Sequence, residues 1–133
     1  MANFASSKGM ASELIAQSLL IAKGYSVFVP LVDEAYDLVA HENGTGESYK
    51  IQVKTLRIRD DRENALVVKA TTSKSEYYPK DAVDYILAIN IDEGLGYLIE
   101  NNEQKEYWAK DFATASKKWT ELRLGGDIYG DPR

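Results

Sequence analysis

Residues 36–56 have the sequence YDLVAHENGTGESYKIQVKTL, and the rest of the predicted fold is built around them. Tyr36 to His41 is mostly apolar and contains one acid, Asp37. The next residues, ENGTGE, contain Asn-Gly and a second glycine, which supply the positive φ angles of a turn. Tyr49 to Leu56 then alternates between apolar and polar residues, a pattern typical of a strand. The stretch therefore predicts two strands joined by a turn.

The alternation in the second strand sorts its side chains onto two faces. One face carries Tyr49, Ile51, Val53 and Thr55, and the other carries Lys50, Gln52 and Lys54. Asp37, near the start of the first strand, is expected to face the region where Gln52 and Lys54 project. A carboxylate, an amide oxygen and a lysine at one place suit a hard cation and a phosphate group.

The composition limits the chemistry that this site can use. The 133 residues predict one domain, residues 1–133, and the apolar content of 44% is sufficient for a core. Cysteine is absent and His41 is the only histidine, which excludes disulfides, cysteine zinc sites and histidine-rich zinc centres. Any metal is therefore expected to be oxygen-ligated, as Mg²⁺ or Mn²⁺ would be. Without a long apolar run or a secretory leader, we expect a cytoplasmic protein with no membrane segment.

The charge is unevenly distributed along the chain. The net charge is −5, but residues 48–80 contain eight basic residues and four acidic ones, so this segment is +4 and the remainder is −9. Half of the basic residues thus lie beside the candidate site. A local basic stripe of this kind can bind phosphates although the whole chain is acidic.

The flanking segments predict a mixed α/β domain. Residues 5–23 form an expected helix with a serine cap and a glycine stop, and Glu13 lies at the border of its apolar stripe, where it can lean toward Asp37. The other expected elements are strands at 25–30, 65–70, 84–91 and 97–100, charged or polar loops at 57–64 and 71–80, a short helix or helical turn within 106–118, an edge strand at 119–124 and a tail at 125–133.

The order of these motifs resembles the PD-(D/E)XK nuclease superfamily. Gln52-Val53-Lys54 begins fifteen positions after Asp37, as in its signature. Residues 8–13, Lys-Gly-Met-Ala-Ser-Glu, are similar to the first helix of that core, and residues 78–100 are similar to its later strands. The resemblance covers about residues 8–100 and leaves 101–133 as a C-terminal extension. It implies a restriction-endonuclease-like fold, a mixed β-sheet core flanked by helices.

The resemblance also implies roles for individual residues. Glu13, Asp37, Gln52 and Lys54 would be catalytic, and Asp37, Glu13 and the backbone carbonyl of Val53 would hold Mg²⁺ or Mn²⁺. Two positions depart from the usual pattern, because Ala35-Tyr36 replaces the proline position and Gln52 replaces an acid. Some intron-encoded members are similar to this chain in having glutamine there.

Double-stranded or branched DNA is the expected partner. The basic and aromatic residues expected to contact it are Lys50, Arg57, Arg59, Lys74, Tyr77, Tyr78 and Lys80. Lysine and arginine would contact phosphates, and the tyrosines would stack on bases.

We therefore expect an Mg²⁺-dependent endodeoxyribonuclease that hydrolyses phosphodiester bonds. Small size and the Gln-x-Lys pattern make it resemble site-specific homing endonucleases, and a Holliday-junction resolvase is the alternative. A catalytically silent DNA-binding or assembly module on the same fold is an alternative from another class, and a domain without a nucleic-acid role is a third. Since cutting two strands needs two sites, we expect a homodimer or homotetramer.

Overall fold

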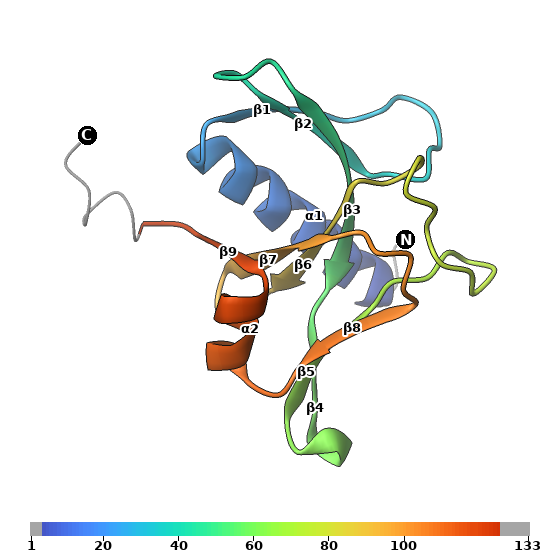
Figure 1. Cartoon of the computed structure of the whole chain (residues 1–133), viewed down its shortest axis with the longest axis vertical. Helices are drawn as coiled ribbons and strands as arrows, with labels where there is room; N and C mark the ends of the chain where they lie inside the picture. Colours follow the sequence, from blue (N-terminus) through green and yellow to red (C-terminus); the bar gives the residue numbers. More distant parts are fainter. Residues whose placement is uncertain (1–3, 126–133) are drawn as a thin grey trace.

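The computed structural model describes residues 4–125, in which α1 covers one face of a six-stranded sheet and a smaller sheet with α2 covers the other (Figure 1). In chain order the elements are α1 (Phe4–Ala22), β1 (Tyr25–Phe28), β2 (Leu38–Glu42), β3 (Ser48–Thr55), β4 (Arg57–Arg59), a 3₁₀ turn (Asp60–Arg62), β5 (Ala65–Lys69), β6 (Tyr85–Asn90), β7 (Leu95–Glu100), β8 (Glu106–Ala109), α2 (Phe112–Lys118) and β9 (Thr120–Arg123).

The large sheet is mixed, with strand order β1-β2-β3-β6-β7-β9. β3 and β6 at its centre run parallel, and all other neighbours in it are antiparallel. Parallel neighbours need a long crossover. Here residues 56–84 provide it and contain β4 and β5, which form the second sheet with β8. The predicted α/β class and mixed sheet are confirmed.

Each face of the large sheet has its own core. On β6, Leu87 and Ile89 pack on the α1 side, whereas Ile86 and Ala88 pack toward the small sheet. All four side chains are fully buried, so β6 is a strand buried on both faces, as its nearly continuous apolar sequence favours. This double burial fixes the register of the central strands, because a one-residue slip would exchange the two faces.

α1 lies within one residue of the predicted helix at each end, but two details of the prediction were wrong. It begins at Phe4, so the serines expected to cap it lie inside the helix. Met10, Leu14 and Ile21 of the expected apolar stripe are exposed. Leu19, Leu20 and Ala16 form its buried stripe, and the helix is followed by Gly24, whose φ of 98° is a left-handed conformation that glycine adopts without strain. The helix passes very close to β7. A Cβ atom at Gly96 would lie 3.1 Å from Leu19 Cδ1 and 2.9 Å from Ile89 Cδ1, so glycine at this position permits the packing.

Two loop or helix predictions were incomplete. The segment 57–64 is not only a loop, because Arg57–Arg59 pairs with β5 before the turn. A three-residue strand is too short to show a hydrophobic period. The helix expected within 106–118 is present only at Phe112–Lys118, where Asp111 Oδ1 caps it by accepting from the Thr114 amide at 2.8 Å. Residues 106–109 form β8 instead.

The last part of the described chain is built into both sheets. β8 pairs with β5, and β9 pairs with β7 at the edge of the large sheet, which confirms the expected edge strand. Apart from Gly125, the expected tail at 125–133 lies outside the described residues. Within residues 4–125, no helix combines the length and hydrophobicity that a membrane crossing would need.

Candidate active site

Asp37 is fixed against β3 immediately before β2 begins. Its backbone amide donates to the carbonyl of Ile51 at 2.8 Å, and its carboxylate Oδ2 accepts from the amide of Val53 at 2.9 Å. The side chain is half-buried. The turn between β2 and β3 sets a register in which Leu38 lies opposite Ile51, and this register brings Asp37 to the middle of the next strand.

α1 brings a second carboxylate to this place. Ser12, which is buried, and Thr55 on β3 form a hydrogen bond of 2.7 Å between their hydroxyls. The bond holds the helix over the end of β3, where Glu13 lies close enough to Asp37 to interact with its charge. A charge interaction thus links the helix glutamate to the strand aspartate, and their shared role in a metal site stays a prediction.

The electrostatics of the pair favour a cation. Burial, and then the negative charge of Asp37, raise the pKa of Glu13. Burial also raises the pKa of Asp37, while the Val53 amide and the positive charge of Lys54 lower it in part. Two partly desolvated carboxylates that repel each other are stabilised by any positive ion placed near both.

Ile51 and Val53 project from one face of β3, and Gln52 and Lys54 project from the other. They align with Ile86 and Ala88 on β6, which face the small sheet. The Lys54 ammonium donates to the carbonyl of Thr71 at 3.1 Å and lies 5.3 Å from the centre of the Tyr78 ring. The predicted alternation of β3 is therefore present, and Lys54 lies close enough to Asp37 to lower its pKa.

The expected DNA-contacting residues are more scattered. Lys50 is directed to the segment before β6, where its ammonium donates to the carbonyl of Asp81 and its amide donates to Asp84 Oδ2 at 2.7 Å. Arg57, Lys74 and Lys80 are exposed. Tyr77 is 44% exposed, whereas Tyr78 is only 6% exposed and donates its hydroxyl to Thr71 O at 3.2 Å. A ring buried in this way has no face available for stacking on a base.

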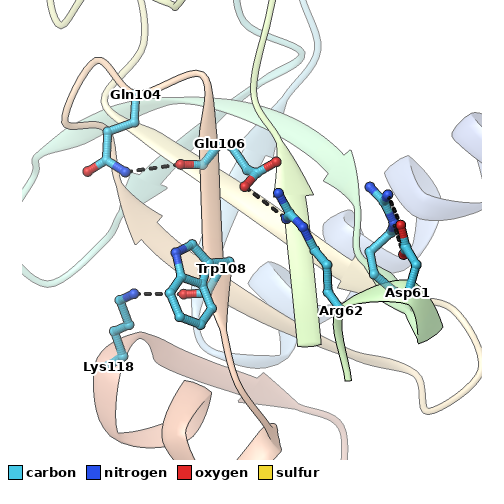
Figure 2. Close-up of polar contacts among 7 residues, drawn as sticks. Asp61, Arg62, Gln104, Glu106, Trp108 and Lys118 are labelled. Atoms are coloured by element: carbon cyan, nitrogen blue, oxygen red, sulfur yellow. Dashed lines mark hydrogen bonds and ion pairs between the residues drawn. The ribbon is translucent and has the colours of Figure 1, made fainter. Parts of the chain in front are cut away.

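Part of the basic stripe is neutralised by neighbouring acids. Arg59 binds Asp61 through two hydrogen bonds of 2.7 and 2.9 Å. Arg62 pairs with Glu106 at 3.0 Å across the small sheet, as Figure 2 shows. Exposed pairs of this kind contribute little to stability. They do reduce the positive charge that the small sheet offers to phosphates.

Sequence reasoning missed the residues that support the site. Ser12 contacts Thr55, and Thr71 contacts Lys54, but the sequence predicted no role for either Ser12 or Thr71. The one available signal for Ser12 was its place beside Glu13 on a helix otherwise apolar on that face. For Thr71 no signal existed, because a backbone carbonyl makes the contact.

Residues 5–125 match the family described as PD-(D/E)XK endonuclease. The chain belongs to the PD-(D/E)XK endonuclease family. A bacterial homing endonuclease, I-Ssp6803I, has a similar structure, with a TM-score of 0.64 and 22% sequence identity over 84% of this chain and 78% of that one. This likeness concerns the fold. No curated protein matches the chain.

Acidic side chains are few at the candidate site. Among residues 4–125 there is no group of three or more histidine, cysteine, aspartate or glutamate side chains arranged to hold a metal ion. Glu13 and Asp37 are two carboxylates whose charges interact there, and the neutral Gln52 stands at the position where the sequence resemblance implies an acid.

Proposed function

We propose that this PD-(D/E)XK endonuclease is a divalent-metal-dependent enzyme that cuts DNA at specific sites, as a homing endonuclease does. The observation that carries the proposal is the Asp37 carboxylate held against the Val53 amide in the middle of β3 at 2.9 Å. The charges of Glu13 and Lys54 also interact with Asp37. Two carboxylates beside one lysine combine ligands for a cation with a positive group for a phosphate. The homing assignment is supported by the structural likeness to an enzyme of that description.

The residues at the site fit a hard divalent cation. The candidate ligand atoms are all oxygens, from Asp37, Glu13, Gln52 and the carbonyl of Val53. Two of these ligands are the carboxylates of Asp37 and Glu13, and burial raises the pKa of both. Mg²⁺ and Mn²⁺ prefer such ligands. A bound ion would supply charge neutralisation at the scissile phosphate and would acidify a water molecule.

The protein's own residues would orient the substrate around this ion. Lys54 would bind a non-bridging phosphate oxygen and hold the attacking water, because an ammonium group has three donors and Thr71 takes only one. Exposed Arg57, Lys74, Lys80 and Tyr77 would contact the DNA backbone on either side. The substrate is duplex DNA under this proposal, with four-way junctions as the alternative.

Calorimetric titration tests the metal site separately from catalysis. Mg²⁺ or Mn²⁺ titrated into the wild type should bind at one class of site, and Asp37→Asn should abolish that binding. Asp84→Asn is the matched control, because Asp84 is also a half-buried carboxylate that accepts a β3 amide, that of Lys50. Equal binding by the wild type and Asp37→Asn would refute the site.

Gln52 specifically favours a second candidate, a module that binds DNA without cutting it. Replacement of an acid by glutamine removes one negative charge from the ligand set, which weakens metal binding. A wild-type protein that shifts DNA in a gel and leaves it intact with Mg²⁺ and with Mn²⁺ would establish this candidate. Competition between linear duplexes and a four-way junction in the same gel distinguishes the homing and resolvase alternatives.

Assembly into a homo-oligomer would supply the second site that double-strand cleavage needs, and the outer face of α1 is the surface we propose for it. From Met10 to the end of the helix, the exposed residues are Met10, Leu14, Ser18, Ile21 and Ala22. Met10, Leu14 and Ile21 are 55%, 55% and 59% exposed, and none of the five is charged. Two copies with a net charge of −5 each would repel least through an uncharged face.

Light scattering after gel filtration tests this surface. The wild type should elute as a dimer or tetramer, and Leu14→Glu should elute as a monomer. Leu124→Glu is the control, because Leu124 is similarly exposed at 49% and lies beyond β9. A monomeric wild type at all concentrations would refute the assembly.

A further inference from the structure

The Lys54 ammonium is held by the loop between β5 and β6. Its nitrogen donates to the Thr71 carbonyl at 3.1 Å, and the Tyr78 hydroxyl donates to the same oxygen at 3.2 Å. The nitrogen also lies 5.3 Å from the centre of the Tyr78 ring. Tyr78 is thus linked to the lysine in two ways. Its ring lies beside the ammonium, and its hydroxyl donates to the carbonyl that also accepts from Lys54.

These contacts restrict a side chain that is otherwise flexible. A lysine has four rotatable bonds, and its ammonium has three donors. The aromatic ring attracts the cation, and the Thr71 carbonyl takes one donor in a fixed direction. Two donors remain, enough for a phosphate oxygen and a water molecule.

Tyr78 is itself rigid. Its side chain is 6% exposed and belongs to the core under the small sheet. Its carbonyl accepts from the buried amide of Asn101 at 2.9 Å, and Asn101 Oδ1 accepts from the amide of Glu103 at 2.9 Å. The segment before it closes on itself, since the Thr72 amide donates to the Glu76 carbonyl at 2.8 Å. Both ends of the loop that holds Lys54 are therefore anchored.

We propose that Tyr78 is a positioning residue for Lys54, holding the ammonium beside Asp37 in the orientation that phosphodiester hydrolysis requires. The inference rests on the proposed endonuclease function, in which Lys54 touches the scissile phosphate. Tyr78 does not contact DNA in this arrangement. It acts through Lys54, so its loss should slow the chemical step and leave DNA affinity unchanged.

Single-turnover cleavage at saturating enzyme separates these two effects. Tyr78→Phe keeps the ring and loses the hydroxyl, so its cleavage rate constant should be about threefold lower than that of the wild type. Tyr78→Leu loses the ring as well, so its rate constant should be lower by about tenfold or more. Tyr25→Phe is the matched control and should cleave like the wild type, because Tyr25 lies on β1 at the edge of the large sheet. All variants should shift the same DNA at the same concentration. Wild-type cleavage by a folded Tyr78→Leu, or parallel losses of binding and cleavage, would overturn the proposal.

A second measurement does not depend on cleavage. Lysines are reductively methylated with ¹³C-formaldehyde and a borohydride reductant, and the Lys54 signal is assigned by its absence in Lys54→Arg. A cation over a ring face should give a signal upfield of the exposed lysines. Tyr78→Leu should return the signal to the common position, while Tyr25→Phe should leave it unchanged. A wild-type Lys54 signal among the exposed lysines would overturn the proposal. A shifted signal with no cleavage by the wild type would instead preserve the positioning and refute the endonuclease function.

Discussion

Asn101 is predicted to be one of the most sensitive polar positions in the protein. It is 3% exposed, and its side-chain amide donates to the carbonyls of Tyr78 and Val83 at 2.9 Å each and to Pro79 at 3.3 Å. Its Oδ1 accepts from the amide of Glu103 at 2.9 Å. One side chain thus forms hydrogen bonds with several backbone carbonyls of residues 78–83, the segment that leads into β6.

The magnitude of an Asn101→Ala substitution follows from those bonds. Three short hydrogen bonds disappear, each with a net value of about 1 kcal/mol, and the buried groups left without a partner add a desolvation penalty. We expect a loss of about 3–4 kcal/mol, a large part of the ~5–15 kcal/mol by which a domain of this kind is stable. The melting temperature should fall by about 10–20 °C.

Urea unfolding followed by circular dichroism measures this loss directly. The urea concentration at the midpoint should fall, while the slope of the unfolding free energy against urea concentration should stay constant, as expected when only the stability changes. Asn102→Ala is the control, because the Asn102 side chain is exposed, and its effect should stay within about 0.5 kcal/mol. A loss below about 1 kcal/mol for Asn101→Ala would refute the reasoning that these bonds hold the segment in place.

Three further predictions concern packing, pH and metal affinity. Gly96→Ala should destabilise the fold by about 1–3 kcal/mol, because the added methyl would lie 2.9 Å from Ile89 Cδ1. Gly44→Ala is the control and should not destabilise it, because a methyl there would lie in open space. Equal urea midpoints for the two variants would contradict the close packing of α1. Glu13→Gln should raise the free energy of unfolding in EDTA at pH 7, because a carboxyl whose pKa is raised on folding destabilises the protein once it ionises. This gain in stability should shrink as the pH falls through the raised pKa and should vanish near pH 3. A gain seen only at pH 3 would reverse the assigned sign. Gln52→Glu should tighten Mg²⁺ binding by on the order of tenfold in calorimetry, and unchanged or weaker binding would argue against Gln52 beside the metal.

The parts of the fold with a strong local pattern were predictable from the sequence. β3 alternates over eight residues, which fixes the faces of Gln52 and Lys54, and the turn before it sets the pairing that brings Asp37 to Val53. The positive φ angles expected at Asn43-Gly44 were wrong, because in this turn only Gly46 has a positive φ, of 81°. The glycine stop of α1 was also predictable, whereas its buried stripe was not, because the helix is apolar on its exposed face as well. The predictable features depend on neighbours within a few residues, so the sequence displays them.

The remaining features depend on partners far away in the chain. Tyr78 lies in a polar stretch that suggested contact with DNA, but Asn101, twenty-three positions later, and the small sheet bury it. β4 and β8 are strands of three and four residues, and only their pairing with β5 makes them strands. The Ser12–Thr55 bond joins residues forty-three positions apart. No local period encodes contacts of this kind.

The measurement that tests the central claim most directly is DNA cleavage by the wild type and by Lys54→Ala, with supercoiled plasmid and a synthetic four-way junction as substrates and Mg²⁺ or Mn²⁺ as the metal. Lys117→Ala serves as the control, because Lys117 is an exposed lysine on α2. We predict that the wild type and Lys117→Ala cut, and that Lys54→Ala binds the same DNA but cuts about 10²–10³-fold more slowly, as expected for loss of a group that stabilises developing charge. Cleavage by Lys54→Ala at the wild-type rate, or DNA binding without cleavage by the wild type in either metal, would contradict the account.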